Sequence, residues 1–419
     1  MQYYMESAML DDLFSLSQTF IRIRNREFKR YFLREHPLTN RFSIIIGQRG
    51  IGKTTAMIQH LLGSCGNDLY TRKALYLQAD HFLVAQSSLY EIADEFYKLG
   101  GELICFDEIH KYTDWSMELK SIFDTFPNLR ILASGSSALE ITRGSHDLSR
   151  RALVYRMYGM SFREYIGMNC GIYFDSLSLD AIVSGHQSAA DAIVGELEKN
   201  GLKALALFRE YLECGYYPYF REFQDKTQFN MTLEQNVHTT LEGDLPAIHQ
   251  SLNGSSIRKI LKLLSIISSL VPFTPDMKQL KQLLGIGDER TLKSYLKYLE
   301  DAGVILTVSR SGKGLREMEK PEKVYLNNPN LYHALAGGKL PDSGAMRETF
   351  FLNMLRVGHN VSVPVRGDFL VNDAITFEVG GKNKDSSQIR NIENAWLALD
   401  NIEIGQGNRI PLWLFGFLY

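Results

Sequence analysis

Short apolar runs alternate with longer amphipathic stretches between residues 42 and 159 of the chain. The apolar runs occupy residues 42–46, 74–78, 102–106, 130–134 and 152–158. Apolar strands of this length, separated by segments long enough to form helices, are typical of a parallel sheet that is covered on both faces. The pattern therefore predicts an α/β domain in the first part of the chain.

The spacing of apolar residues changes on either side of this domain. The first forty residues and residues 160–250 have mostly helical spacing, and a Gly-Tyr-Tyr-Pro sequence at 215–218 interrupts the second region. Basic side chains near the end of the first region fit a solvated helix face: Arg22, Arg24, Arg26, Lys29, Arg30 and Arg34.

A third pattern begins at residue 255. Helices are predicted at 256–270, 277–286 and 288–303, and strands at 304–308 and 323–327. Asp288 suits a helix N-cap, while Gly285 and Gly303 suit helix ends. Three helices followed by a two-stranded wing predict a winged helix-turn-helix.

The last part of the chain returns to an α/β pattern. We expect a helix at 347–358, strands at 368–373 and 374–381, a helix at 388–400 and a buried strand at 411–419. These patterns predict four domains: 1–160, 161–250, 251–335 and 336–419.

A glycine-rich segment follows the first predicted strand and leads into a helix. Residues 47–54 match the pattern G-x-x-x-x-G-K-[ST] in full. Glycines let backbone N–H groups surround a phosphate, the helix N-terminus faces the anion, Lys53 supplies a cation, and the Thr54 hydroxyl ligates Mg²⁺. The residues predicted to bind the nucleotide are Gly47, Gln48, Arg49, Gly50, Ile51, Gly52, Lys53, Thr54 and Thr55.

Two acidic residues end the third predicted strand. Asp107 would hold Mg²⁺, and Glu108 would orient or deprotonate the attacking water. The next strand ends in a serine-rich sequence, where Ser134 or Ser136 could hydrogen-bond the water or the γ-phosphate. A turn that caps the following helix is the alternative reading of these serines.

Two arginines precede the fifth predicted strand. Arg150 or Arg151 could act as an arginine finger toward its own or a neighbour's γ-phosphate, and a surface salt bridge is the alternative. The catalytic residues that we predict are Lys53, Glu108, Ser134 and Arg151.

The order of these motifs resembles the prokaryotic AAA-type ATPases related to the archaeal ATPase group. The resemblance extends through a Ser-Phe-Arg-Glu-Tyr sequence at 161–165 and the Gly-Tyr-Tyr-Pro sequence at 215–218. It implies an AAA+-like sheet, followed by a helical region, a winged helix and a C-terminal domain often described as DUF4143-like. ATP and Mg²⁺ are the implied cofactors.

The C-terminal segment at 367–384 resembles the core of the PD-(D/E)xK nuclease fold. The resemblance implies a metal site on Asp368 and Glu378, with Glu348 as a further acidic position and Gln388 on the following helix.

This segment departs from the nuclease pattern at its lysine. The residue two positions after Glu378 is Gly380, and Lys382 lies about 6.6 Å further along an extended strand. A bulge at the glycines could return Lys382 to the site. A second site of Asp368, Glu378 and Lys382 and a degenerate domain used for binding or packing are both open.

The charge composition of the chain limits which partners it can attract electrostatically. The 419 residues carry a net charge of -2, so attraction to DNA must come from a local patch. The predicted winged helix and its flanks, residues 255–323, hold thirteen lysines and arginines against eight acidic residues. On the third helix these are Arg290, Lys293 and Lys297, and on the wing Arg310, Lys313 and Arg316. DNA contact and a structural role are both open.

The four cysteines form no Cys-x-x-Cys pair, and no stretch reads as a signal peptide or membrane span. We expect a cytoplasmic protein without a membrane partner.

Three functions fit the sequence. Our main prediction is Mg²⁺-dependent ATP hydrolysis that drives a switch or motor acting on DNA or a protein partner, with an oligomer left open. The alternatives are an ATP-dependent nuclease and a STAND-type switch that binds ATP without turnover. Glu108 favours hydrolysis, since a pure switch needs no hydrolytic base.

Overall fold

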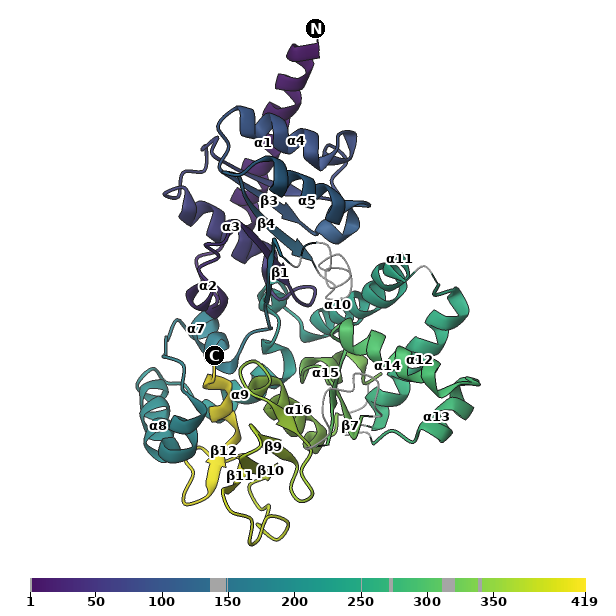
Figure 1. The fold of residues 1–419 in the computed structure, drawn as a ribbon. Coiled ribbons are helices and arrows are strands. Elements are labelled where there is room, and N and C mark those ends of the chain that lie inside the picture. Colours follow the sequence, from purple (N-terminus) through teal and green to yellow (C-terminus); the bar gives the residue numbers. More distant parts are fainter. Residues whose placement is uncertain are drawn as a thin grey trace. The chain divides into compact units, whose positions relative to one another are not determined.

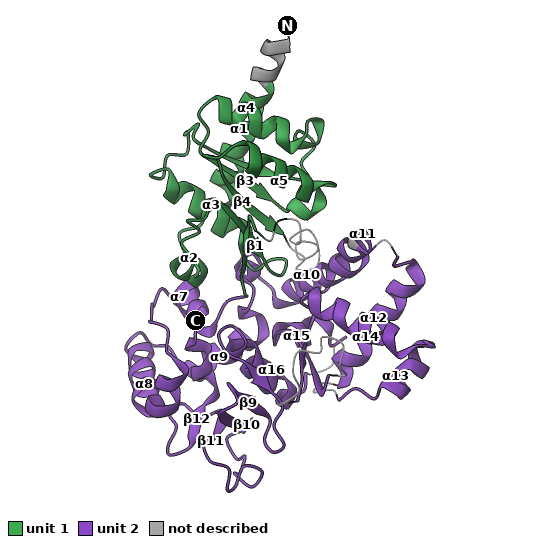
Figure 2. Cartoon of the chain, viewed as in Figure 1, with its two compact units in different colours: residues 1–158 green, residues 159–419 purple. Residues whose placement is uncertain are grey.

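The computed structural model describes residues 2–135, 148, 150–249, 251–270, 274–310, 321–337 and 341–419, with side chains from residue 9 onward apart from those of residues 247 and 248. Two compact units divide the chain, residues 1–158 and residues 159–419 (Figure 2). The finer division into four domains stays a prediction.

Unit 1 is built on a five-stranded parallel sheet (Figure 1). Its strands are β1 (Phe42–Ile46), β2 (Ala74–Gln78), β3 (Leu103–Asp107), β4 (Arg130–Gly135) and β5 (Leu153–Arg156). The spatial order is β2-β3-β4-β1-β5. Strands β1 to β4 are buried almost throughout, because helices cover the sheet, whereas β5 lies at an edge and is more exposed. The predicted α/β sheet is confirmed.

Among the described residues of unit 1, the α-helices are α1 (Gln2–Arg24), α2 (Tyr31–Glu35), α3 (Lys53–Ser64), α4 (Leu89–Lys98) and α5 (Trp115–Thr125). Helix α3 begins directly after the glycine-rich loop and contacts β2, β3 and β4. Helix α4 begins with a reciprocal capping box between Ser88 and Glu91, which satisfies N–H groups at the helix start.

Unit 2 starts with helices. They are α7 (Phe162–Cys170), α8 (Leu179–Lys199), α9 (Ala204–Glu210), α10 (Lys226–Thr239) and α11 (Leu245–Ile248). A π-helical turn, Tyr211–Gly215, leads into the Gly-Tyr-Tyr-Pro sequence. The amide of Asn330 donates hydrogen bonds of 3.0 and 2.9 Å to the carbonyls of Tyr211 and Leu212. The side chain thereby satisfies carbonyls in this wider turn.

Three helices and a hairpin follow, as predicted. They are α12 (Gly254–Leu270), α13 (Met277–Leu284), α14 (Glu289–Asp301), β6 (Ile305–Val308) and β7 (Lys323–Leu326), with the two strands antiparallel. Asp288 caps α14, because its side chain accepts a hydrogen bond from the N–H of Arg290. Gly285 and Gly303 both have a positive φ at the predicted helix ends.

The C-terminal part contains a second five-stranded sheet in the order β12-β11-β10-β9-β8. Its elements are α15 (Asn330–Leu335), α16 (Ser343–Leu355), β8 (Val361–Ser362), β9 (Phe369–Val371), β10 (Ile375–Gly381), β11 (Ala395–Asp400) and β12 (Arg409–Pro411). Strands β10, β11 and β12 are parallel, and β8 and β9 add antiparallel to the other edge.

Two predictions for this part were wrong. The expected helix at 388–400 is a series of turns followed by strand β11, and the expected terminal strand is β12 followed by a short 3₁₀ helix, Leu412–Phe417. The three middle residues of β11 are buried one after another, which means that both faces of this strand are covered. A short, continuously apolar run gives no alternation by which a strand can be told from a helix.

Candidate functional site

The glycine-rich loop joins β1 to α3 in unit 1. Gly50 and Gly52 have φ values of 82° and 102°, a left-handed region that favours glycine. Gly47 faces a different constraint, because a Cβ atom there would lie 2.4 Å from the carbonyl oxygen of Met157. The loop therefore needs glycine at Gly47 and Gly52, which the motif specifies, and also at Gly50, which it does not.

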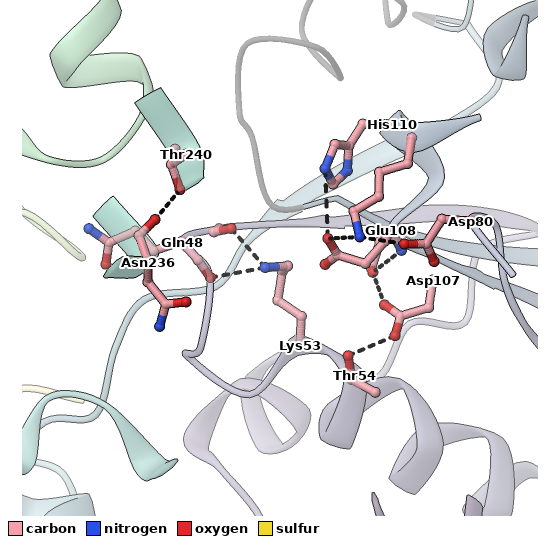
Figure 3. A network of polar contacts seen from close by, with 12 residues as sticks. Gln48, Lys53, Thr54, Asp80, Asp107, Glu108, His110, Asn236 and Thr240 are labelled. Atoms are coloured by element: carbon pink, nitrogen blue, oxygen red, sulfur yellow. Dashed lines mark hydrogen bonds and ion pairs between the residues drawn. The ribbon is translucent and has the colours of Figure 1, made fainter. Parts of the chain in front are cut away.

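Lys53 is the first residue of α3 and is 5% exposed. Its ammonium donates hydrogen bonds of 2.9 Å to the carbonyls of Gly47 and Gln48 (Figure 3). The cation thus lies over the loop and beside the N-terminus of α3, where backbone N–H groups carry partial positive charge. This arrangement can receive an anionic group.

Asp107 ends β3 and is fully buried, with 0% exposure. Three hydroxyl groups donate to its carboxylate. Thr54 donates to Oδ2 at 2.7 Å, Tyr76 to the same oxygen at 2.6 Å, and Ser134 to Oδ1. Ser134 on β4 lies next to Asp107 on β3 because β4 is placed between β1 and β3 in the sheet. The donors are neutral, so they orient the carboxylate and leave its negative charge uncancelled.

The donor set suits magnesium. Mg²⁺ prefers hard oxygen ligands and is commonly bound by one or two protein oxygens together with phosphates and water. The Thr54 hydroxyl and the Asp107 carboxylate are adjacent oxygens beside the glycine-rich loop. Burial, together with the neighbouring Asp107 carboxylate, raises the pKa of Tyr76, so its hydroxyl stays protonated and donates.

Glu108 follows Asp107 in a left-handed backbone conformation with φ of 53°. Such a φ is uncommon for a residue with a side chain and often occurs at functional sites. The N–H of Glu108 donates to Ser134 Oγ at 3.2 Å. Its carboxylate oxygen lies 3.7 Å from His110 Nε2 and 3.9 Å from Lys111 Nζ. The side chain is 19% exposed, so water can reach it more easily than it reaches Asp107.

The structure also shows where the remaining predicted residues lie. Gln48, Arg49 and Thr55 are partly buried around the loop, and Ile51 is buried in the core of unit 1. Arg151 forms a bidentate pair with Asp124, at 2.8 and 2.9 Å, which is the salt bridge named as the alternative to an arginine finger. Ser136 lies outside the described residues.

Arg30 is a residue that sequence reasoning assigned to a solvated face. It is 5% exposed, and its guanidinium donates to the carbonyls of Ile51 at 2.7 Å and Tyr158 at 3.0 Å. Arg30 therefore ties the glycine-rich loop to the end of the sheet. No pattern distinguished it from the neighbouring basic residues.

A second cluster of charged residues lies in unit 2. Lys323 on β7 contacts Glu348 on α16 and Asp368 before β9, at 3.3 Å each. Tyr325 donates to Glu348 at 2.7 Å. Glu378 on β10 is 0% exposed and its Oε1 lies 2.5 Å from the ammonium of Lys384, while Oε2 has no hydrogen-bond partner among the described residues.

Lys384, rather than the predicted Lys382, is the cation beside Glu378. Lys382 is exposed, and the N–H of Lys384 donates to the carbonyl of Gly381 in a turn just after β10. The turn brings Lys384 back over the strand, which a count along an extended strand cannot anticipate. Gln388 lies among turns instead of on the predicted helix.

Burial is the main cause of the pKa shifts of two glutamates in this cluster. It raises the pKa of Glu378 and of Glu348, and the nearby Asp368 carboxylate adds to both shifts. Within the described part of the chain, no three acidic, histidine or cysteine side chains are grouped so that they could hold a metal ion.

Several positive charges in the α12–α14 region have local partners. Lys259 and Lys262 on α12 donate to the carbonyls of Gly285 and Leu283 at the end of α13. On α14, Lys293 pairs with Glu289 and Lys297 with Asp301. Lys313 and Arg316 of the predicted wing lie outside the described residues. Much of the basic character of this region therefore has an intramolecular role.

Comparison with known families identifies two segments. Residues 39–166, which contain the glycine-rich loop and strands β1 to β5, match the model of an AAA domain. Residues 205–342 match a domain of unknown function, DUF8612. The expected DUF4143-like domain is not confirmed by these matches.

One protein sequence and two solved structures illustrate what the chain is similar to. An uncharacterised protein of Methanocaldococcus jannaschii is 25% identical over 409 residues, which cover 90% of this chain and 84% of that protein. A Walker-type ATPase of Pyrococcus abyssi is similar in structure, at 12% identity and a TM-score of 0.39, covering 75% of this chain and 97% of that one. Domain III of the replication initiation protein DnaA of Thermotoga maritima has a TM-score of 0.25 at 14% identity, covering 43% and 88%.

The described helices do not include one with the length and apolar character needed to cross a membrane.

Proposed function

We propose that the chain binds ATP with Mg²⁺ in unit 1 and hydrolyses it, and that turnover drives a switch or motor acting on a macromolecular partner. The observation that carries this proposal is the Thr54 hydroxyl at 2.7 Å from the buried Asp107 carboxylate, directly beside the glycine-rich loop. These are the protein oxygens that a Mg²⁺-nucleotide site of this type requires. The AAA-domain match over residues 39–166 supports it independently.

Each residue has a role in this proposal. The loop from Gly47 to Gly52 and the N-terminus of α3 bind the phosphates, and Lys53 neutralises their charge. Thr54 and Asp107 would hold Mg²⁺, and the bound ion would supply positive charge that polarises the γ-phosphate. Glu108 orients or deprotonates the attacking water. Ser134 accepts from the backbone N–H of Glu108 and donates to the Asp107 carboxylate, so it holds the two residues in place.

Fewer observations bear on the macromolecular partner than on the nucleotide site. The helices α12 to α14 and the hairpin β6–β7 have the element order of a winged helix, which supports contact with DNA. Lys259, Lys262, Lys293 and Lys297 already have intramolecular partners, so they offer less to phosphates than their number suggests. We therefore keep DNA and protein as alternative partners, and an oligomer remains open.

The test is ATP turnover by the full chain with Mg²⁺, measured with and without duplex DNA. We compare the wild type with Lys53→Ala, and we use Lys98→Ala as a control. Lys98 is an exposed lysine of the same unit that pairs with Asp94 on its own helix. The proposal predicts turnover that Lys53→Ala removes and Lys98→Ala retains.

The DNA arm separates the partners. Stimulation of turnover by DNA supports coupling between the winged helix and the ATPase unit. Turnover that is indifferent to DNA supports a protein partner. Binding of ATP without any turnover would contradict the hydrolytic role of Glu108 and favour the STAND-type switch.

A nuclease is the second candidate function, and one observation favours it. Lys384 lies 2.5 Å from the buried Glu378, which restores the lysine that the sequence pattern lacked at Gly380. Asp368, Glu378 and Lys384 would then be the cleavage residues in place of a set containing Lys382. Manganese-dependent nicking of a plasmid that Asp368→Ala abolishes would support this function, and its absence in the wild type would exclude it.

A further inference from the structure

Tyr76 contacts the centre of the proposed Mg²⁺-nucleotide site, although it belongs to none of the sequence motifs. Its hydroxyl donates to Asp107 Oδ2 at 2.6 Å, the same oxygen that accepts from Thr54 at 2.7 Å. Ser134 donates to the other carboxylate oxygen. An ionised carboxylate has about four lone-pair directions. The three hydroxyls occupy three of them and leave one for an ion or its water.

The position of Tyr76 is fixed by the sheet. Tyr76 pairs with Cys105 in the register of β2 with β3, two residues before Asp107. Because successive side chains on a strand alternate between faces, Tyr76, Cys105 and Asp107 occupy equivalent sides of the two paired strands. The ring of Tyr76 is fully buried, so few alternative rotamers are available to it.

Helix α1 supports Tyr76 from the edge of the sheet. Strand β2 is the outermost strand, so some of its N–H groups face away from β3. The N–H of Tyr76 donates to Ser17 Oγ on α1 at 3.1 Å. The ring of Phe20, also on α1, contacts the Tyr76 ring edge-on with a centroid separation of 6.2 Å. The N-terminal helix is thereby connected to Asp107 through one side chain.

We propose that Tyr76 is a positioning residue of the Mg²⁺-nucleotide site, an inference that rests on the proposed function. Its hydroxyl holds the Asp107 carboxylate in the orientation that Mg²⁺ binding needs. A lysine or arginine could also orient Asp107, but its charge would compete with the cation. A neutral tyrosine supplies direction without that competition.

The experiment is Tyr76→Phe in the full chain, with Tyr165→Phe as a matched control. Tyr165 is a buried tyrosine of unit 2 whose hydroxyl donates to Glu210 at 3.1 Å, so the control also removes a tyrosine–carboxylate hydrogen bond. The primary readout is binding of a fluorescent ADP or ATP analogue as Mg²⁺ is varied, which does not depend on turnover. Thermal unfolding without nucleotide verifies that each variant is folded.

We expect Tyr76→Phe to raise the Mg²⁺ concentration for half-maximal binding about tenfold, the usual effect of losing one hydrogen bond to a charged group. Binding of the nucleotide without Mg²⁺ stays unchanged, and Tyr165→Phe has the Mg²⁺ dependence of the wild type. An unchanged Mg²⁺ dependence in Tyr76→Phe overturns the proposal. An equal loss of affinity with and without Mg²⁺ also overturns it, because that result indicates a general structural role.

A double-mutant cycle with Asp107→Asn tests whether Tyr76 acts through Asp107. If it does, Tyr76→Phe has little further effect on Mg²⁺ dependence in the Asp107→Asn background. Additive effects contradict the proposal. Failure of the wild type to hydrolyse ATP would refute the proposed turnover and still leave Tyr76 testable by Mg²⁺-dependent binding, so the two failures can be told apart.

Discussion

Asp107 in unit 1 and Glu378 in unit 2 are both fully buried carboxylates on a central strand, but their neighbours differ. Asp107 accepts hydrogen bonds from the neutral hydroxyls of Thr54, Tyr76 and Ser134. Glu378 lies against the ammonium of Lys384. Neutral donors orient a buried charge and leave it available to a metal ion, whereas an adjacent ammonium neutralises it. The comparison indicates that the first site is built to receive a cation and that the second already contains one.

The largest effect that we expect is on turnover at the first site. Glu108→Gln removes the base and keeps the shape, so ATP hydrolysis falls about 10²- to 10⁴-fold while nucleotide binding persists. Steady-state and binding assays measure the two properties separately. Glu102→Gln is the control, because Glu102 directly precedes strand β3 and forms an exposed ion pair with Lys73. Equal turnover in Glu108→Gln and the control would contradict the assigned role.

The second prediction concerns the stability of unit 2. Lys384→Met leaves the buried Glu378 without its cation, which costs several kcal/mol for a fully buried pair. Because Lys384 is 31% exposed, we expect a smaller loss of about 2 kcal/mol in the free energy of unfolding.

The measurement for this prediction is denaturant unfolding, followed by tryptophan fluorescence. Trp396 and Trp413 report on unit 2, and Trp115 reports on unit 1. Lys382→Met is the matched control at the lysine that the sequence pattern had suggested, and it should behave as the wild type. An unfolding free energy of Lys384→Met equal to that of the wild type and the control would show that the ion pair has no stabilising role.

The third prediction is a pH dependence in the same cluster. Burial raises the pKa of Glu378 above its ordinary value of 4.5, so the folded state holds this proton to a higher pH than the unfolded state does. The protonated Glu378 side chain therefore contributes stability that is fully present below its ordinary pKa. This contribution is lost as pH rises through the raised pKa of the folded state. It amounts to about 1.4 kcal/mol for each unit by which the two pKa values differ.

We therefore expect Glu378→Gln to lose stability relative to the wild type at acidic pH and to gain relative stability as pH rises. The difference in unfolding free energy, measured between about pH 4 and pH 8, gives the sign. A difference that is constant over this range would mean that Glu378 has the same pKa in both states.

The smallest effect concerns metal ions without nucleotide. Lys323 lies 3.3 Å from both Glu348 and Asp368, so its ammonium already supplies a positive charge to these two carboxylates. Millimolar Mn²⁺ should therefore leave the unfolding midpoint of unit 2 unchanged in the wild type and raise it in a Lys323→Met, Lys384→Met double variant. Stabilisation of wild-type unit 2 by Mn²⁺ would remove the distinction between the two sites and strengthen the nuclease alternative.

Sequence reasoning succeeded where a local pattern determines the structure. The five strands of the first sheet, the loop into α3 and the helix ends at Gly285 and Gly303 all follow from spacing and glycine chemistry. The position of Asp107 and Glu108 at a strand end was also predictable, because an apolar strand leads directly into them, whereas their roles stay a prediction.

The missed features depend on contacts between distant residues. Tyr76 reaches the site through the packing of β2, and Arg30 reaches it through the packing of the segment before α2. Nothing in the sequence next to either residue indicates this contact. Lys384 reaches Glu378 through a turn after β10. Strand β11 was taken for a helix because burial on both faces removes the alternation that identifies a strand. Local composition cannot encode these tertiary relations.

The most direct test of the hydrolytic site is a single-turnover assay. Purified full-length protein in excess over labelled ATP is incubated with Mg²⁺ or with a chelator, and the nucleotide on the protein is identified over time. We predict conversion of bound ATP to ADP with Mg²⁺ in the wild type, and intact bound ATP in Glu108→Gln. Intact ATP on the wild-type protein with Mg²⁺, at full occupancy, would contradict the claim that Asp107 and Glu108 form a hydrolytic site.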